Sequence, residues 1–218
     1  EAEDGRFAWP ELDEHSACGL CYTSGTTGDP KGVLYSHRSV VLHALAAGLR
    51  GALDLSAFDC VMPCSSLYHA TAWGLPFAVA INGCKFVLPC ERMDGRSLQE
   101  LIRNEGVTLS GGVPTIWTMY LDHLERSGED SGSLQRLVIG GSAVPRAMAE
   151  RFQQRYGVAI RQLGGRSETS TLGVVAPLPP FTGPNGPTTA SITGAVTVTV
   201  ATALSQLVGL VISQMVYG

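Results

Sequence analysis

The sequence predicts an α/β fold in which mostly parallel sheets are covered by helices. Short apolar segments typical of strands alternate along the chain with helical segments of roughly ten residues. The 218 residues have the composition of a globular protein, with 44% hydrophobic and 16% charged residues. Three glycine-containing loops, at 24–32, 140–144 and 163–169, follow predicted strands. Since parallel sheets place their sites at loops leaving the carboxyl ends of strands, we expect the chemistry at these loops.

The first elements surround the first of these loops. The apolar run 17–23 has the character of a strand that enters the loop, and residues 33–35 resume as a second strand. Ser36 or Ser39 can cap a helix that extends to about Arg50. The buried stripe of this helix is expected to consist of Val40, Val41, Ala44 and Leu45.

The middle of the chain contains two further strand–helix pairs. Residues 83–89 are typical of a short strand, and Ser97 to Glu100 match a capping box that opens a helix ending at Gly106. Residues 107–114 predict the next strand, and Pro114 suits the first position of a helix. The residues expected to lie on one face of that helix are Ile116, Tyr120 and Leu124.

The predicted domain closes with a strand, a helix and a further strand. These segments span residues 134–141, 145–156 and 158–162. Residues 1–14 contain six acidic side chains and are expected to form an exposed lead-in. Together these elements predict one α/β domain over residues 1–176.

The chain changes character after Glu168. None of the final 50 residues is charged, and five of the twelve prolines lie between 177 and 187. Residues 177–190 are therefore expected to form a Pro/Gly-rich linker, and 191–218 an uncharged apolar tail of unknown role. Residues 192–216 are long enough to span a bilayer, but four threonines and two glutamines make this a weak candidate for membrane contact. An unpacked tail and a tail packed on the domain are the alternatives.

The net charge and the cysteines limit which partners and which cellular compartment are expected. The net charge of −4 and the lack of a Lys/Arg block argue against nucleic acid as a partner. The chain begins with Glu1 and no signal-peptide pattern leads it, so we expect a fragment of a longer cytoplasmic protein. Cys18 and Cys21 have the spacing of half a metal site or of a redox pair, but residues three apart on a strand point to opposite faces. Reduced, packed cysteines are the favoured interpretation.

The loop within "YTSGTTGDPKGVLYSH", residues 22–37, combines glycines, hydroxyls and one of only two lysines. Gly25 and Gly28 permit positive φ angles, so backbone N–H groups can surround phosphate oxygens. Lys31 adds a point charge suited to a polyphosphate. The neutral hydroxyl donors are Thr23, Ser24, Thr26 and Thr27. The spacing differs from that of a P-loop NTPase, and composition alone leaves an ordinary surface loop as the alternative.

The stretch "YTSGTTGDPKGV" closely resembles the phosphate-loop signature of the adenylate-forming family, which includes acyl-CoA synthetases. Residues 66–89, 111–121 and 134–148 resemble, in the same order, the fatty-acyl-CoA synthetases of medium and long chain preference. The resemblance extends from about residue 7 to residue 178. It implies part of the large N-terminal domain of a ligase. It also implies that ATP converts a fatty carboxylate to acyl-AMP, which then reacts with coenzyme A.

The resemblance also implies roles for individual residues. Thr23 to Lys31 would hold the β- and γ-phosphates, Ser167 the α-phosphate, and Glu168, with Thr23, the Mg²⁺ ion. His69 and Trp73 match the acyl-site histidine and the aromatic gate of the acyl tunnel. Lys31, Ser167 and Glu168 are thus the candidate catalytic residues. The resemblance also implies that residues at the ends of the predicted strands 134–141 and 158–162, and in the loops after them, bind the nucleotide. These residues are Gly141, Ser142, Ala143, Gln162, Gly164, Gly165 and Ser167.

The third loop departs from the family pattern. Gly164 stands where the family has Tyr or Trp, and Arg166 where it has Met or Leu. The lysine-bearing C-terminal domain of the family does not follow in this sequence, so the isolated chain is expected to be inactive or impaired. A non-catalytic nucleotide- or acyl-binding remnant is the alternative. A chain tethered to a membrane by its tail is a third interpretation.

Three of these candidate residues also have a purely structural interpretation. His69 could be packed, Trp73 a core aromatic, and Glu168 an acid at a helix start. The other histidines are expected to be structural or exposed, namely His15, His37, His43 and His123.

Overall fold

A computed structural model describes residues 8–23, 29–170 and 172–177. The central sheet consists of β3 (Cys60–Pro63), β4 (Lys85–Phe86), β5 (Leu109–Gly112), β6 (Arg136–Ile139), β7 (Ala159–Gly164) and β8 (Val174–Pro177). The strand order is β4-β3-β5-β6-β7-β8. The five strands β3, β4, β5, β6 and β7 run parallel, and β8 pairs antiparallel with β7. The predicted α/β fold with a mostly parallel sheet is confirmed.

Two strands of this sheet were not expected from the sequence. All four residues of β3 are buried, so its sequence lacks the polar–apolar alternation that identifies a strand with one exposed face. Strand β8 is formed by four residues of the region where the sequence indicated only a change in composition. Strands β4, β5 and β6 lie within the predicted segments and are shorter than those segments, whereas β7 begins one residue after the start of the predicted segment 158–162 and extends two residues beyond its end.

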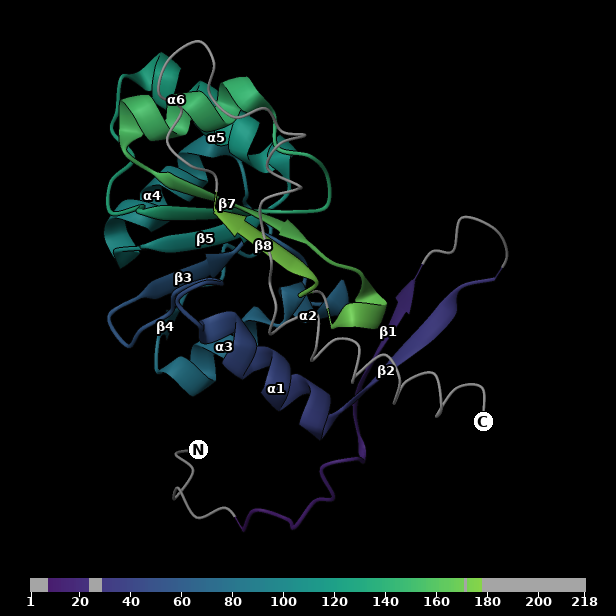
Figure 1. Cartoon of the computed structure of the whole chain (residues 1–218). Coiled ribbons are helices and arrows are strands. Elements are labelled where there is room, and N and C mark those ends of the chain that lie inside the picture. Colours follow the sequence, from purple (N-terminus) through teal and green to yellow (C-terminus); the bar gives the residue numbers. More distant parts are fainter. Residues whose placement is uncertain (1–7, 24–28, 171, 178–218) are drawn as a thin grey trace.

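Helices cover both faces of the sheet (Figure 1). One face carries α1 (His37–Gly48) and α3 (Leu75–Asn82), and the other carries α4 (Gly95–Glu105), α5 (Pro114–Ser127) and α6 (Arg146–Tyr156). Side chains of β3 alternate between the two layers, because successive residues of a strand point to opposite faces. Met62 belongs to the apolar cluster that includes α4, α5 and α6, and Val61 to the cluster that includes α1 and α3.

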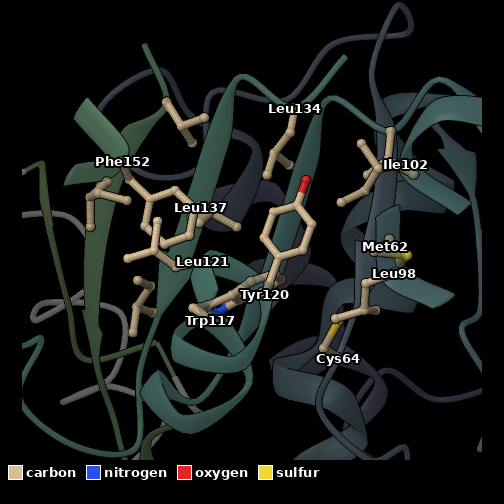
Figure 2. Packing of buried hydrophobic residues seen from close by; sticks show 14 of the residues in the cluster. Met62, Cys64, Leu98, Ile102, Trp117, Tyr120, Leu121, Leu134, Leu137 and Phe152 are labelled. Atoms are coloured by element: carbon tan, nitrogen blue, oxygen red, sulfur yellow. The ribbon is translucent and has the colours of Figure 1, made fainter. Parts of the chain in front are cut away.

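The larger cluster is built around three aromatic rings, as Figure 2 shows. Trp117 and Tyr120 from α5 and Phe152 from α6 are all fully buried. Tyr120 meets Trp117 edge-on at 6.3 Å between ring centroids and stacks with Phe152 at 6.2 Å. These are the offset and edge geometries that aromatic pairs prefer. The expected core positions of Tyr120 and Leu124 are confirmed, and Ile116 is partly buried.

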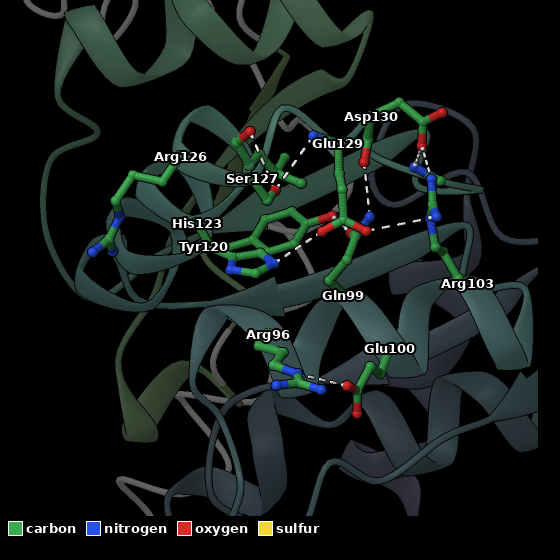
Figure 3. A network of polar contacts seen from close by, with 12 residues as sticks. Arg96, Gln99, Glu100, Arg103, Tyr120, His123, Arg126, Ser127, Glu129 and Asp130 are labelled. Atoms are coloured by element: carbon green, nitrogen blue, oxygen red, sulfur yellow. Dashed lines mark hydrogen bonds and ion pairs between the residues drawn. The ribbon is translucent and has the colours of Figure 1, made fainter.

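A polar network joins α4, α5 and the turn after α5 (Figure 3). The buried Tyr120 hydroxyl donates to Gln99 Oε1 at 2.7 Å, and Gln99 Nε2 donates to the Asp130 carbonyl at 2.8 Å. Arg103 donates to the Asp130 carboxylate at 3.0 Å, and His123 lies 3.2 Å from Glu129. Each buried polar group in this chain of contacts therefore has a partner.

Helix boundaries agree with the sequence at some points and differ at others. Pro114 begins α5, Gly106 ends α4 with φ of 71°, and Ser36 caps α1 by accepting from the Ser39 amide at 3.1 Å. The predicted capping box at Ser97 is wrong as the start of α4. Asp94 is the N-cap, and its carboxylate accepts from the Ser97 amide at 3.1 Å.

The predicted buried stripe of α1 is partly wrong. Ala44 is buried as predicted, but Val41 is 48% exposed and Leu45 51% exposed. His43 and Ala47 are buried instead. The reason is close packing of α1 on α3: a Cβ on Gly48 would lie 2.5 Å from Asn82 Nδ2. Small residues therefore occupy this contact, and the larger aliphatic residues, which a periodicity argument weights most, lie outside it.

Several expectations concern segments outside the described residues. These are the loop residues 24–28, the first half of the acidic lead-in (residues 1–7), the linker beyond 177 and the tail 191–218. Within 8–23, 29–170 and 172–177, none of the helices combines the length and apolar character required to cross a bilayer.

Candidate functional site

A two-stranded hairpin frames the hydroxyl-rich loop. Strand β1 (Ala17–Thr23) pairs antiparallel with β2 (Lys31–Ser36), and Thr23 lies opposite Lys31 in the register. The Thr23 hydroxyl donates to the Lys31 carbonyl at 3.4 Å, so the two ends of the loop are held side by side. The Lys31 side chain is exposed. The remaining predicted loop contacts fall outside the described residues: Ser24, Gly25, Thr26, Thr27 and Gly28.

The two faces of the hairpin differ in burial. Cys21, Val33 and Tyr35 are buried together. Cys18 is exposed while Cys21 is buried, as expected for residues on opposite faces of a strand. No group of three or more His, Cys, Asp or Glu side chains suited to a metal ion occurs in the described part of the chain.

Tyr35 connects the hairpin to the loop that follows β7. Its hydroxyl donates to the carbonyl of Ser167 at 2.7 Å, across 132 residues of sequence. Burial raises the pKa of Tyr35, and the nearby Cys21 and Glu168 raise it further, so the phenol stays protonated and remains a donor. Ser167 and Glu168 lie in the short 3-10 turn Ser167–Thr169, which Figure 1 shows in green beside the hairpin.

The other predicted nucleotide residues gather at one edge of the sheet. Gln162 and Gly164 belong to the last residues of β7, and Gly165 follows this strand. Gly141, Ser142 and Ala143 follow β6 and are exposed. Because β6 and β7 are adjacent parallel strands, both loops leave the sheet at the same edge. Gly141 has φ of 81°, a conformation that favours glycine.

A left-handed turn carries one predicted acyl-site residue, Trp73, and directly follows the other, His69. The four residues of α2 (Ala70–Trp73) have φ between 46° and 60°, a region that costs an L-residue roughly 1–2 kcal/mol. The turn directs the Trp73 ring to the edge of the sheet where the loops after β6 and β7 begin. A Cβ on Gly140 would lie 3.3 Å from this ring, and a Cβ on Gly111 3.7 Å. Trp73 is buried in the smaller cluster, and His69, just before the turn, is exposed rather than packed.

A cavity of about 210 Å³ lies between the hairpin, α1 and the left-handed turn. Its lining includes Tyr35, His43, Thr71, Gly74 and Phe77. The sequence indicated neither the role of Tyr35 nor the position of His43. Tyr35 alternates with Val33 on the predicted strand, which indicated burial but no polar partner. His43 gave no indication of a site, because its neighbours along the helix are apolar.

Comparisons with known proteins agree with one another. A family model described as AMP-binding enzyme matches residues 2–205. A 3-methylmercaptopropionyl-CoA ligase of Ruegeria lacuscaerulensis is 49% identical over 79% of this chain and 32% of its own length. A long-chain-fatty-acid–CoA ligase of Thermus thermophilus is 51% identical over 73% of this chain and 29% of its own length. The chain thus spans about a third of the length of these curated relatives.

A solved structure shows the same fold. The inhibitor-bound N-terminal domain of FACL13 from Mycobacterium tuberculosis superposes with a TM-score of 0.69 at 24% identity. The match covers 77% of this chain and 42% of that domain's chain.

Proposed function

The chain belongs to the AMP-binding enzyme family, and we propose that it is the ATP- and acid-binding part of a fatty-acyl-CoA ligase. In the proposed reaction a carboxylate oxygen of the fatty acid attacks the α-phosphorus of ATP, which forms acyl-AMP and releases pyrophosphate. The thiol of coenzyme A then attacks the acyl carbon, and AMP leaves as the thioester forms. Relatives named for medium-chain and long-chain fatty acids support this acid class.

The observation that carries the proposal is the hairpin and its link to the loop after β7. Thr23 and Lys31 bring together the ends of a loop rich in glycine and hydroxyl groups. The hydrogen bond from Tyr35 holds Ser167 next to the same hairpin. A phosphate chain bound by the first loop would therefore extend towards Ser167 and Glu168.

The protein residues would act mainly by positioning and charge stabilisation. Lys31, exposed at the first position of β2, supplies a positive charge for the leaving pyrophosphate. Ser167 offers a hydroxyl donor to the α-phosphate. Gly141, Ser142 and Ala143 are exposed residues with small side chains, and they would form a flat surface for the adenine ring. Trp73 gives the acid an apolar wall at the same edge of the sheet.

Magnesium fits the donors present. The Glu168 carboxylate is exposed, and Mg²⁺ in nucleotide sites is commonly held by one or two carboxylates together with substrate phosphates. Glu168 would therefore hold the ion jointly with ATP, and the bound ion would neutralise charge on the phosphate oxygens. Because ATP and coenzyme A are intracellular cosubstrates, the proposal implies a cytoplasmic location.

The chain contains only two lysines, Lys31 and Lys85, so a matched pair of variants tests the nucleotide site. Lys31→Ala should weaken MgATP binding, measured by calorimetry, about tenfold or more, because it removes a charge-assisted phosphate contact. Its melting temperature should not change, since the side chain is exposed. Lys85 forms an exposed ion pair with Glu105 at 2.7 Å, and Lys85→Ala should leave MgATP binding unchanged. Equal binding by both variants would count against the proposal.

Gly164 favours a second candidate function, a nucleotide- or acyl-binding protein without catalysis. The residue is exposed at the end of β7 and offers no aromatic surface for an adenine ring. Exchange of labelled pyrophosphate into ATP separates the two functions. Because the isolated chain is expected to be impaired, even slow exchange that depends on added fatty acid supports the ligase, whereas binding of MgATP and fatty acid without detectable exchange supports the second candidate.

A further inference from the structure

The turn that carries Trp73 has a backbone conformation that residues other than glycine rarely adopt. Four successive residues other than glycine, from Ala70 to Trp73, adopt left-handed φ angles, and Gly74 continues them with φ of 70°. Runs of this kind persist only where the surrounding structure holds them. The contacts of this turn with the rest of the fold therefore determine where Trp73 lies.

His43 makes such a contact from α1. Its Nε2 atom lies 3.1 Å from the Trp73 carbonyl oxygen. The ring also packs directly on Gly74, where a Cβ would lie only 2.2 Å from Nε2. The imidazole therefore contacts the backbone at the C-terminal end of the left-handed turn, and only a glycine leaves it room.

The protonation state of His43 follows from its surroundings. A carbonyl oxygen can only accept a hydrogen bond, so Nε2 carries the proton and donates it. Burial lowers the pKa of His43 to about 4, so the ring is neutral at physiological pH. The unprotonated Nδ1 is buried and has no hydrogen-bond partner among the described residues. The polar contact that this buried ring makes is thus directed at Trp73.

We propose that His43 is a positioning residue for the acid-binding side of the site. Its hydrogen bond to the Trp73 carbonyl keeps the turn left-handed and thereby keeps the Trp73 ring against Gly111 and Gly140. His43 itself touches no reacting group in this proposal and acts through Trp73. The inference rests on the proposed function, because it is the acid that would bind beside Trp73.

Two substitutions separate the hydrogen bond from simple packing. His43→Leu keeps an apolar side chain of similar size but removes the donor, and His43→Gln retains an N–H that can reach the carbonyl. The position of the Trp73 ring can be followed without any ligand, by ¹⁹F NMR of protein labelled with 5-fluorotryptophan. Trp73→Phe assigns the Trp73 resonance, and the buried Trp117 serves as an internal reference.

We expect His43→Leu to shift or broaden the Trp73 resonance while the Trp117 resonance stays in place. Decanoate should bind this variant about fivefold to tenfold more weakly than the wild type, the effect of one lost hydrogen bond, while MgATP affinity stays within about twofold. His43→Gln should resemble the wild type in both measurements. Should His43→Leu fold poorly, His43→Met provides a more adaptable side chain that also lacks a donor.

An unmoved Trp73 resonance in His43→Leu, or equal losses in the Leu and Gln variants, would overturn the inference. Equal losses would show that the size of the ring matters and its donor does not. If the wild type binds neither MgATP nor decanoate, the proposed function fails, and the fluorine spectra then decide by themselves whether His43 holds the turn.

Discussion

Tyr35→Phe should weaken the link between the hairpin and the turn that carries Ser167 and Glu168. The substitution removes one oxygen from a ring that is 6% exposed and leaves the packing of the ring intact. The lost hydrogen bond, 2.7 Å long in the wild type, should reduce the free energy of unfolding by about 1 kcal/mol, because Ser167 is only half-buried and water can replace part of the interaction. For a domain of this size, that loss corresponds to a melting temperature about 2–4 °C lower.

The local effect of Tyr35→Phe can be measured at the turn itself. The Thr169 amide donates to the Arg166 carbonyl at 3.0 Å, and the Ser170 amide donates to the Ser167 carbonyl at 3.2 Å. A loss of about 1 kcal/mol should make hydrogen exchange at these two amides about fivefold faster. MgATP should bind up to about fivefold more weakly, because the turn must be ordered again when the nucleotide binds.

Tyr120→Phe is the matched control. The Tyr120 hydroxyl donates to Gln99 at the same distance of 2.7 Å, within the network of Figure 3 and away from the hairpin. This variant should lose as much stability or more, with MgATP affinity unchanged. Unchanged hydrogen exchange at Thr169 and Ser170 in Tyr35→Phe, or an equal loss of MgATP affinity in both variants, would contradict this role of Tyr35.

Three further predictions follow from single contacts. Gly164→Tyr should bind MgATP roughly tenfold more tightly in calorimetry, because a Cβ there would meet nothing closer than 3.9 Å and the ring could stack on adenine; unchanged affinity would show that adenine lies elsewhere. Asp59→Asn should lower the free energy of urea unfolding by about 3 kcal/mol or more, because it leaves the Arg136 guanidinium, whose side chain is only 13% exposed, without its carboxylate partner; a loss below about 1 kcal/mol would contradict this. The pKa of His43 is lowered from 6.5 to about 4, so the unfolded state binds more protons than the folded state in this interval. Relative to His43→Gln, the wild type should therefore lose about 3 kcal/mol of its free energy of unfolding as the pH falls from 6.5 to 4. If the free energy of unfolding changes with pH in the same way in both proteins, the ring is not held neutral by burial.

Features that depend on local chemistry could be predicted from the sequence. Pro114 begins a helix because its fixed φ and missing N–H suit the first turn, and Gly106 ends one because glycine adopts a left-handed φ without strain. The alternation of strands and helices also predicts that the loops after β6 and β7 lie at the same edge of the sheet. The resemblance to a family provided the candidate roles of residues at that edge.

Features that depend on distant contacts could not be predicted in this way. The left-handed turn at Ala70–Trp73 contradicts local preference, and only tertiary contacts such as that of His43 explain it. The bond between Tyr35 and Ser167 joins residues with no relation in sequence. The orientation of α1 was only partly predicted: Ala44 is buried as expected, but close packing on α3 buries His43 and Ala47 in place of Val41 and Leu45.

The position of β7 near the end of the sheet has a consequence for synthesis of the protein. The hairpin with Lys31 is translated first, but its partner Ser167 follows 132 residues after Tyr35. At roughly 5–20 residues per second, a ribosome takes several seconds or more to add that interval. During this time the hairpin lacks the partner loop that follows β7. If the chain binds MgATP as proposed, the nucleotide cannot contact both loops until β7 has left the exit tunnel of the ribosome.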